Sequence, residues 1–408
     1  MSGSVKRVAV VAPGLQYGGG VPSMALFLYR LLESTDRYEP ELVSLSIAAD
    51  DPLSVRLLDP ASWRRGVQTR AGRWRGLPVT YVGAFLAEFE FQRFRPRRAL
   101  AKLLEPFDLV QVVAGTPAMG MAVAGVQKPR CLFAATTIRR ERASLLAATS
   151  GARRLWLRLM TAVNAASERR ALGQIDHVFA LSEYTRSQLA GMVPESKLSL
   201  GWPGVDTDLY HPAEPPAGDG CILAVGRFGD PRKNVRLLLE AYRRLCERLP
   251  DTPRLVLVGG QPQPADWAEA VRWDLVGHVE VRAEVAPEVL PDLYRQAALF
   301  VLPSNEEGLG IVLLEAMASG LPVVSTRCGG PETCVVDGET GYLTPVGDAQ
   351  ALAAAMERLL ADAALRQQMG RAGRRLVQSR FSIQAAGEPF LAVYDRLLGG
   401  AVRPGSRP

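Results

Sequence analysis

Short apolar runs alternate along the chain with longer segments that have helical spacing. Runs rich in Val, Ile and Leu occur at residues 5–13, 108–113, 130–136, 177–182, 221–227, 254–260, 279–285, 299–304 and 322–326. Residues 235–249, between two of these runs, repeat their apolar side chains every three or four positions, as an amphipathic helix does. Continuous apolar strands that alternate with helices are typical of parallel sheets covered on both faces. The pattern therefore predicts an α/β protein.

A segment rich in proline and glycine, residues 203–220, interrupts this alternation near the middle of the chain. At about 150 residues per domain, 408 residues suggest two or three domains. We expect two Rossmann-like, doubly wound domains in series, residues 1–200 and 201–380, that face each other across a cleft. A last helix is expected within residues 381–400, and it could cross back to the first domain.

Composition excludes several classes of protein. With 48% hydrophobic and 22% charged residues, the chain resembles ordinary globular proteins and neither disordered nor coiled-coil sequences. No apolar run reaches the roughly 18 residues of a spanning helix, and no secretory signal pattern precedes the first strand. The five cysteines lack CxxC spacing, which argues against a disulfide scaffold or a zinc site. We therefore expect a cytoplasmic protein.

Charge is distributed unevenly between the two halves. Of 48 Lys or Arg and 42 Asp or Glu in the chain, residues 1–197 hold 27 and 16, and the remainder holds 21 and 26. In the first half, arginines mix with aromatic and aliphatic residues in two segments, 63–75 and 85–104. Such a surface suits an anionic membrane, at the inner face of which the protein could lie, or a phosphorylated acceptor; a merely solvated arginine-rich surface is the alternative. Nucleic acid is not expected, because no nucleic-acid motif accompanies the charge.

The first candidate ligand site is a glycine loop, Gly18-Gly19-Gly20, between the first strand and the first helix. Glycines allow a phosphate to approach the backbone, and the helix N-terminus adds amides and a positive dipole. The loop matches neither GxGxxG nor a P-loop, and no acidic residue is clearly placed for a ribose. A nicotinamide-dependent dehydrogenase is therefore disfavoured.

Two further motifs follow strands of the second half. Arg227 and Lys233 lie in the segment 226–234, where two cations at a strand exit can hold a diphosphate and stabilise it as it departs. Glu307 and Glu315 are separated by seven residues in the segment 303–326. This segment predicts a strand, a loop and a helix whose amides suit a phosphate, while its carboxylates can accept bonds from sugar hydroxyls.

These motifs together resemble the retaining glycosyltransferases of family 4, the group 1 glycosyltransferases, which have the GT-B fold. The most specific part of the match is the Glu-x7-Glu motif from Glu307 to Glu315, and the resemblance covers nearly the whole chain. Supporting segments are Gly19-Gly20, LSEYTR (181–186), PGVD (203–206), GR…KN (226–234) and GGPETCVVDGETGYL (329–343).

The resemblance implies a nucleotide-sugar donor bound mainly by the second domain. Arg227 and Lys233 would neutralise its diphosphate as catalytic groups, and the backbone amides of Leu309, Gly310 and Ile311 would add phosphate contacts. No metal is expected at the diphosphate, and no other cofactor.

The resemblance also assigns roles at the sugar and the ribose. Glu307 would contact hydroxyls of the transferred sugar, and Glu315 would bind those of the ribose. Gly19 and Gly20 would close on the donor from the first domain. The base, uridine or guanosine, stays open.

The expected reaction is transfer of a hexose-type sugar to a glycan or lipid-linked acceptor, as in polysaccharide biosynthesis, with retention of configuration. One departure from the family concerns a histidine that many members carry after a strand of the first domain. Thr136 or Thr137 stands in this place. A sugar-nucleotide 2-epimerase of the same fold and a non-catalytic nucleotide-sugar-binding subunit remain alternatives.

Overall fold

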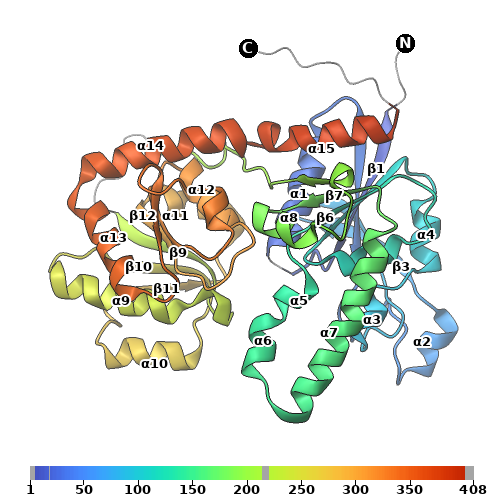
Figure 1. The fold of residues 1–408 in the computed structure, drawn as a ribbon, viewed down its shortest axis with the longest axis horizontal. Coiled ribbons are helices and arrows are strands. Elements are labelled where there is room, and N and C mark those ends of the chain that lie inside the picture. The colour runs from blue at the N-terminus through green and yellow to red at the C-terminus, as the bar shows by residue number, and fades with distance from the viewer. Residues whose placement is uncertain (1–4, 18, 214–219, 400–408) are drawn as a thin grey trace. The chain divides into compact units, whose positions relative to one another are not determined.

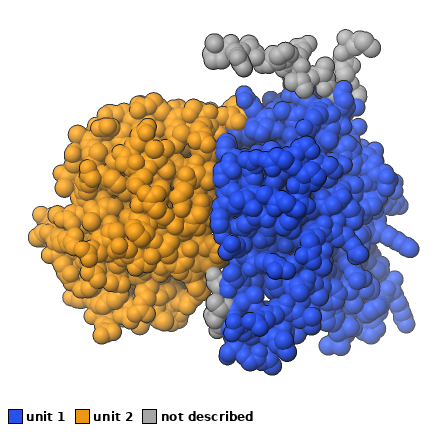
Figure 2. Space-filling model, viewed as in Figure 1, with its two compact units in different colours: residues 1–204, 386–408 blue, residues 205–385 orange. Residues whose placement is uncertain are grey.

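The computed structural model describes residues 5–17, 19–213 and 220–399. The chain divides into two compact units (Figure 2): unit 1 comprises Met1–Gly204 and Ala386–Pro408, and unit 2 comprises Val205–Ala385. Each unit is built around one β-sheet with helices packed on it (Figure 1).

The sheet of unit 1 has eight strands in the order β3-β4-β2-β1-β5-β6-β7-β8. Its strands are β1 (Lys6–Pro13), β2 (Tyr38–Leu45), β3 (Thr69–Trp74), β4 (Leu77–Val82), β5 (Leu109–Ala114), β6 (Arg130–Ala134), β7 (His177–Ala180) and β8 (Leu198–Leu200). All neighbours run parallel except β3 and β4, which form an antiparallel hairpin at one edge. The apolar strands of the centre are fully buried, as the continuous Val and Leu runs predicted.

The hairpin β3–β4 corrects the expectation of a purely parallel sheet. Its turn is Arg75-Gly76, and both residues have positive φ, 49° and 79°. This is the backbone of a type I′ turn, for which Asn-Gly or Asp-Gly is the usual sequence signal. Because arginine stands in the first position of the turn, the sequence did not indicate a hairpin here. The strand β3 also lies within the basic segment 63–75, which the sequence analysis interpreted as surface.

The helices of unit 1 pack on both faces of its sheet. They are α1 (Gly20–Glu33), α2 (Pro60–Arg65), α3 (Glu90–Arg93), α4 (Arg98–Leu104), α5 (Ile138–Glu141), α6 (Ala143–Ala148), α7 (Gly151–Leu172) and α8 (Glu183–Leu189), with the 3-10 helix η1 (Pro117–Val123). The last helix, α15 (Ile383–Leu397), belongs to this unit from Ala386 onward. Tyr394 of α15 donates a hydrogen bond of 2.7 Å to the buried Gln111 of β5, which anchors the helix on the sheet.

The sheet of unit 2 has six parallel strands in the order β11-β10-β9-β12-β13-β14. They are β9 (Cys221–Arg227), β10 (Leu255–Gly260), β11 (Val279–Ala283), β12 (Ala297–Leu302), β13 (Val323–Thr326) and β14 (Gly341–Thr344). Its helices are α9 (Val235–Arg248), α10 (Pro264–Arg272), α11 (Leu290–Arg295), α12 (Ile311–Ala318), α13 (Ala349–Ala361) and α14 (Ala363–Arg380). This order, 3-2-1-4-5-6 in sequence terms, is that of a Rossmann fold.

The two sheets confirm the predicted fold class of two Rossmann-like α/β units. Their placement across a cleft stays a prediction. Among the described residues, no helix combines the length and the apolar character that crossing a bilayer requires.

Candidate active site in unit 2

The topology of unit 2 singles out one place on its sheet. β9 lies between β10 and β12. After β9 the chain adds β10 and β11 on one side of it, and it then returns to add β12, β13 and β14 on the other side. Ligands of open α/β sheets bind at such a switch point, beyond the carboxyl ends of the strands. The segments that follow β9 and β12 there, residues 228–234 and 303–310, belong to the two predicted motifs, 226–234 and 303–326.

The structure brings the two motifs into direct contact. Lys233 Nζ lies 2.5 Å from Glu307 Oε1, and both side chains are mostly buried, with 18% and 11% exposed. Glu307 Oε1 also accepts a hydrogen bond of 2.7 Å from Ser304 Oγ. A buried charge is stable only when it is paired and hydrogen-bonded. In this pair each side chain provides the opposite charge that the other requires. The ammonium group has three donors, so Lys233 can still donate to a phosphate oxygen.

Backbone and side-chain bonds fix this contact between the loops. The amide of Asn305 donates to the carbonyl oxygen of Arg232 at 2.7 Å, and Asn234 Nδ2 donates to Asn305 Oδ1 at 2.8 Å. Asn234 is also the N-cap of α9, with a left-handed backbone and an acceptor bond from the amide of Leu237. The same residue therefore starts the helix and holds the two loops together.

Arg227, the second predicted cation, stands apart from this pair. Its side chain is 64% exposed and lies 3.8 Å from Asp230. Because an exposed ion pair at this distance holds a side chain weakly, the guanidinium is available to a phosphate. Sequence reasoning placed both cations beside one turn, and the structure distinguishes an anchored Lys233 from an exposed Arg227.

The loop after β12 ends in a helix start that suits an anion. Gly310 is the N-cap of α12 with a φ of 84°, a backbone conformation that glycine adopts without strain. No acidic residue occupies the first turn of α12, so its amides keep their positive potential. Leu309 is buried and Ile311 is the first residue of the helix. This geometry is compatible with the phosphate role that the resemblance implies for these three amides.

A second loop closes tightly on this helix start. A Cβ built on Gly330 would lie 2.5 Å from the Leu309 nitrogen and 2.6 Å from the Gly308 carbonyl carbon. Backbone atoms cannot yield at such distances, so only glycine fits at position 330. Glu307 and Gly329 form an isolated parallel bridge beside it. The sequence analysis included this loop among the family motifs without assigning it a role.

Glu315, on α12, has a partner that sequence reasoning missed. Tyr294 of α11 is fully buried, and its hydroxyl donates a hydrogen bond of 2.8 Å to Glu315 Oε2. Burial and the neighbouring carboxylate raise the pKa of Tyr294 well above its usual range, so it remains a donor. The contact fixes one oxygen of Glu315. No motif connects two residues 21 positions apart on different helices.

Gly19 and Gly20 lie in the other unit. Gly19 is the N-cap of α1 with a φ of 127°, and Gly20 is the first residue of that helix. Gly18 lies outside the described residues. Both glycines are at the carboxyl end of β1, as predicted, and their closure on a donor stays a prediction.

The carboxyl end of β6 in unit 1 carries a buried polar cluster that the sequence suggested only in part. Glu168 of α7 accepts a hydrogen bond of 2.8 Å from the amide of Ile138, and burial raises the pKa of its carboxyl to about 7. Among the described residues, buried polar atoms of Thr136, Asn164 and Gln188 have no hydrogen-bond partner. The cluster therefore has hydrogen-bond donors and acceptors without a described partner. It lies where many members of the family carry a histidine.

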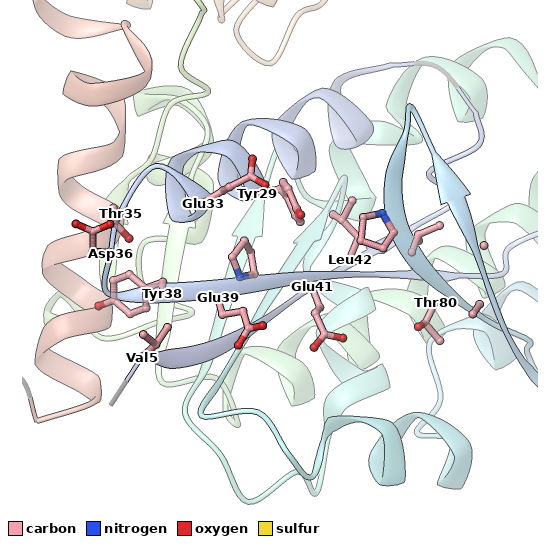
Figure 3. Close-up of a pocket in the computed structure, with 15 residues that line it drawn as sticks. Val5, Tyr29, Glu33, Thr35, Asp36, Tyr38, Glu39, Glu41, Leu42 and Thr80 are labelled. Atoms are coloured by element: carbon pink, nitrogen blue, oxygen red, sulfur yellow. The ribbon is translucent and has the colours of Figure 1, made fainter. Parts of the chain in front are cut away.

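A pocket of about 690 Å³ in unit 1 lies elsewhere (Figure 3). It is at the amino-terminal ends of β1, β2 and β4, opposite the edge at which α/β sheets bind ligands. Its lining includes Glu33, Asp36, Glu39 and Glu41, whose carboxylates would repel a diphosphate. A smaller pocket of about 320 Å³ lies at the carboxyl end of β2, beside Ser44, and it is better placed for a ligand.

Comparison with known proteins identifies the family of the chain. The family model of glycosyl transferases group 1 matches residues 219–362. A GDP-mannose-dependent alpha-(1-6)-phosphatidylinositol monomannoside mannosyltransferase of Mycolicibacterium smegmatis is 34% identical over 270 residues, covering 61% of this chain and 69% of the relative. A D-inositol 3-phosphate glycosyltransferase of Corynebacterium diphtheriae is 38% identical over 210 residues. These cover 47% of this chain and 49% of that relative, so the chain spans about half of its length.

Solved structures share the fold over nearly the whole chain. A sucrose-phosphate synthase from Thermosynechococcus elongatus has a TM-score of 0.72 at 20% identity and covers 97% of this chain and 99% of its own. The Anabaena HepE protein in complex with UDP-glucose has a TM-score of 0.69 at 17% identity, covering 96% and 100%. The fold is therefore that of the GT-B glycosyltransferases. The chain belongs to the group 1 glycosyltransferases.

Proposed function

We propose that this glycosyltransferase moves a sugar from a UDP- or GDP-sugar to a glycan or lipid-linked acceptor, with retention of configuration and without a metal at the diphosphate. The observation that carries the proposal is the contact of Lys233 with Glu307 at the switch point of the unit 2 sheet. A cation and a carboxylate meet there beside a helix N-terminus. That combination suits a charged diphosphate joined to a hydroxyl-rich sugar.

Each predicted side chain has a role in the reaction. Lys233 and Arg227 neutralise the diphosphate as it departs, together with the amides of Leu309, Gly310 and Ile311. Charge stabilisation of this kind is usually the largest contribution to such a reaction. Glu307 holds hydroxyls of the transferred sugar.

The residues that bind the ribose of the donor and those that cover the donor are assigned in the same way. Glu315, with one oxygen fixed by Tyr294, binds the ribose hydroxyls. Gly19 and Gly20 cover the donor from unit 1.

The bond between the sugar and the diphosphate breaks as the bond to the acceptor oxygen forms on the same face. The acceptor's proton passes to the leaving diphosphate. Retention follows from attack on that face. The cleft must exclude water before the sugar is activated, because water would otherwise compete with the acceptor.

Two further observations support the choice of donor and acceptor. The printed names of the relatives include a GDP-mannose-dependent enzyme that acts on a phosphatidylinositol mannoside, and HepE was solved with UDP-glucose. An acceptor with a lipid anchor would also account for the basic character of the first half of the chain. We therefore include peripheral contact of unit 1 with an anionic membrane in the proposal, which places the enzyme in the cytoplasm at the membrane's inner face.

The first test is a thermal-shift panel of the purified protein with UDP, GDP, ADP, TDP and their common sugars, without added metal. A ligand that binds only the native state at about 100 times its Kd stabilises it by about 2.7 kcal/mol. We expect a shift with uridine or guanosine nucleotides, and its loss in Glu315→Ala. The control is Glu339→Ala, which removes an exposed carboxylate of the same unit and should leave the shift intact.

The panel also separates the alternatives. A shift followed by epimerised nucleotide-sugar without acceptor would identify an epimerase. A shift with neither transfer nor donor hydrolysis across a broad acceptor panel would identify a binding subunit. NMR of the product's anomeric proton decides between retention and inversion.

A further inference from the structure

The helix α7 of unit 1 begins as an exposed projection. Residues 151–156 are all exposed, and the buried side chains of the helix start at Leu157. Figure 1 shows α6 and the first turns of α7 as a helical hairpin that extends away from the sheet of unit 1. α7 packs against η1, α5, α3 and α6, and its buried side chains lie between Leu157 and Leu172.

α7 carries large apolar residues on its solvent-facing side as well as on its buried side, which holds Leu157 and Leu172. Its solvent-facing side carries Leu155, Trp156, Leu159 and Val163, with 70%, 57%, 58% and 37% of each exposed. These four residues, hereafter the apolar stripe, lie within about one third of the helix circumference because their spacing is one, three or four positions. Thr161, Asn164 and Glu168 face the protein instead.

An exposed apolar stripe of this kind costs solvation free energy unless something covers it. Soluble proteins tolerate single exposed apolar residues, but a row that includes Trp and two Leu on one projecting helix marks an interaction surface. The charge around the stripe indicates what covers it. Residues 142–167 contain no Asp or Glu.

Four arginines lie in the same acid-free segment. Arg142 forms an ion pair with Glu90. Arg153, Arg154 and Arg158 are exposed on α7, and no ion pair involves them among the residues the structure describes. Arginines beside an apolar stripe that includes a tryptophan are typical of helices that lie in the interface of an anionic bilayer.

We propose that α7 docks unit 1 on a membrane, with the apolar stripe inserted into the head-group region of an anionic bilayer and Arg153, Arg154 and Arg158 bound to its phosphates. This inference rests on the proposed membrane contact and assigns the element that makes it. An interfacial helix inserts its apolar face by about 5–10 Å, a depth that the projecting first turns of α7 can reach without unfolding.

This assignment differs from the segments that the sequence indicated. Trp63 and Phe85, two of the exposed aromatics of those segments, pack edge to face on each other at 5.5 Å. Each therefore already covers part of the other. Trp156 has no ring partner among the described residues.

The test is co-sedimentation of the whole chain with vesicles of pure phosphatidylcholine and of an equal mixture of phosphatidylcholine and phosphatidylglycerol. We expect binding to the anionic vesicles at low salt that weakens as salt screens the charges. Arg154→Gln with Arg158→Gln should weaken it about 25-fold, at about fivefold per arginine. Leu155→Ser, Trp156→Ser and Leu159→Ser together should weaken it by at least about tenfold.

Matched controls come from unit 2. Arg371→Gln with Arg375→Gln changes the same charge on α14, and Val271→Ser with Val276→Ser changes two exposed apolar residues beside α10. Both pairs should leave vesicle binding unchanged. Bromine-labelled acyl chains should quench wild-type tryptophan fluorescence more than that of Trp156→Phe.

Each other outcome overturns the inference in a recognisable way. Equal binding to both vesicles, or binding unaffected by the α7 variants, removes α7 from the membrane contact. Loss of binding only in Trp63→Ser with Phe85→Ser would move the contact to that pair. A mass in light scattering that falls from dimer to monomer in the stripe variant, without vesicle binding, would show that a second copy covers the stripe. Because nucleotide binding is measured separately by thermal shift, failure here leaves the donor proposal standing.

Discussion

The carboxyl edges of the two sheets carry different polar chemistry. In unit 2, the loops after β9 and β12 bring opposite charges into contact, Lys233 with Glu307. In unit 1, the loop after β6 lies beside neutral polar groups, including those of Thr136 and Asn164, some of whose polar atoms have no partner in the described structure, and beside the carboxyl of Glu168. Fixed charges suit a diphosphate, whereas spare hydroxyl and amide groups suit an uncharged hydroxyl ligand. The difference fits the proposed division between a donor site in unit 2 and an acceptor site in unit 1.

The net charges of the two units are the reverse of what these sites would suggest. Unit 1 holds 30 Lys or Arg against 18 Asp or Glu, and unit 2 holds 18 against 24. The proposed diphosphate site thus lies in the acidic unit. A few cations placed by the fold, and not the net charge of the unit, decide where an anion binds, because the interaction falls off within about 10 Å in salt.

The largest effect is expected from replacing Lys233, the mostly buried cation at the carboxyl edge of the unit 2 sheet. Lys233→Met should lower kcat by about 10²–10³, because one donor to a departing phosphate is worth that much. The measurement is steady-state transfer once a donor is known. Arg236→Gln, which changes an exposed cation in the first turn of α9, should leave kcat unchanged. If Lys233→Met kept full activity, the diphosphate role would be wrong.

The pH dependence of the free energy of unfolding tests the carboxyl edge of the unit 1 sheet. Because the folded pKa of Glu168 is raised from 4.5 to about 7, the native state holds this proton more tightly than the unfolded state does. The free energy of unfolding therefore falls as pH rises from about 4.5 to 7, by roughly 3 kcal/mol for this group. Denaturant unfolding of Glu168→Gln should lack that part of the pH dependence.

Glu105→Gln, an exposed carboxyl at the end of α4, serves as the control for the pH experiment and should follow the wild type. A Glu168→Gln profile parallel to that of the wild type would mean that the carboxyl titrates as if it were in water.

A smaller effect is expected where a loop of unit 2 closes on the start of α12. Gly330→Ala places a methyl group against the backbone of Leu309 and should lower the free energy of unfolding by about 1–3 kcal/mol. Gly277→Ala meets nothing within 4 Å and should change it little. Chemical denaturation of both variants measures the difference; equal stabilities would show that the two loops separate readily.

The smallest effect is expected from the positioning residue Tyr294. Tyr294→Phe removes the donor to Glu315, so the Kd for the donor nucleotide should rise about threefold to tenfold while kcat changes little. Tyr242→Phe is the matched control, since Tyr242 is equally buried but donates to the carbonyl oxygen of Pro253. It should reduce stability without changing the Kd. The same change in both variants would reduce Tyr294 to a packing role.

Much of the fold was predictable, and the exceptions have physical reasons. The strands with unbroken apolar runs, such as β9 and β12, were predicted because burial on both faces requires such runs. β2 was missed because Glu39, Pro40 and Glu41 lie near its start, and β14 because its residues, Gly-Tyr-Leu-Thr, contain no continuous apolar run. The apolar stripe of α7 was missed because the sequence analysis looked for arginine-rich clusters in other segments.

The sequence by itself determined the α/β class, the family and the residue types of the proposed donor site, because local periodicity and a spaced motif are properties of the chain. Only the tertiary structure decided that Lys233 pairs with Glu307, that Tyr294 donates to Glu315, and that the apolar stripe of α7 is left exposed. Each of these depends on which strands and helices become neighbours. That choice is made by packing between segments far apart in the chain, and no local pattern records it.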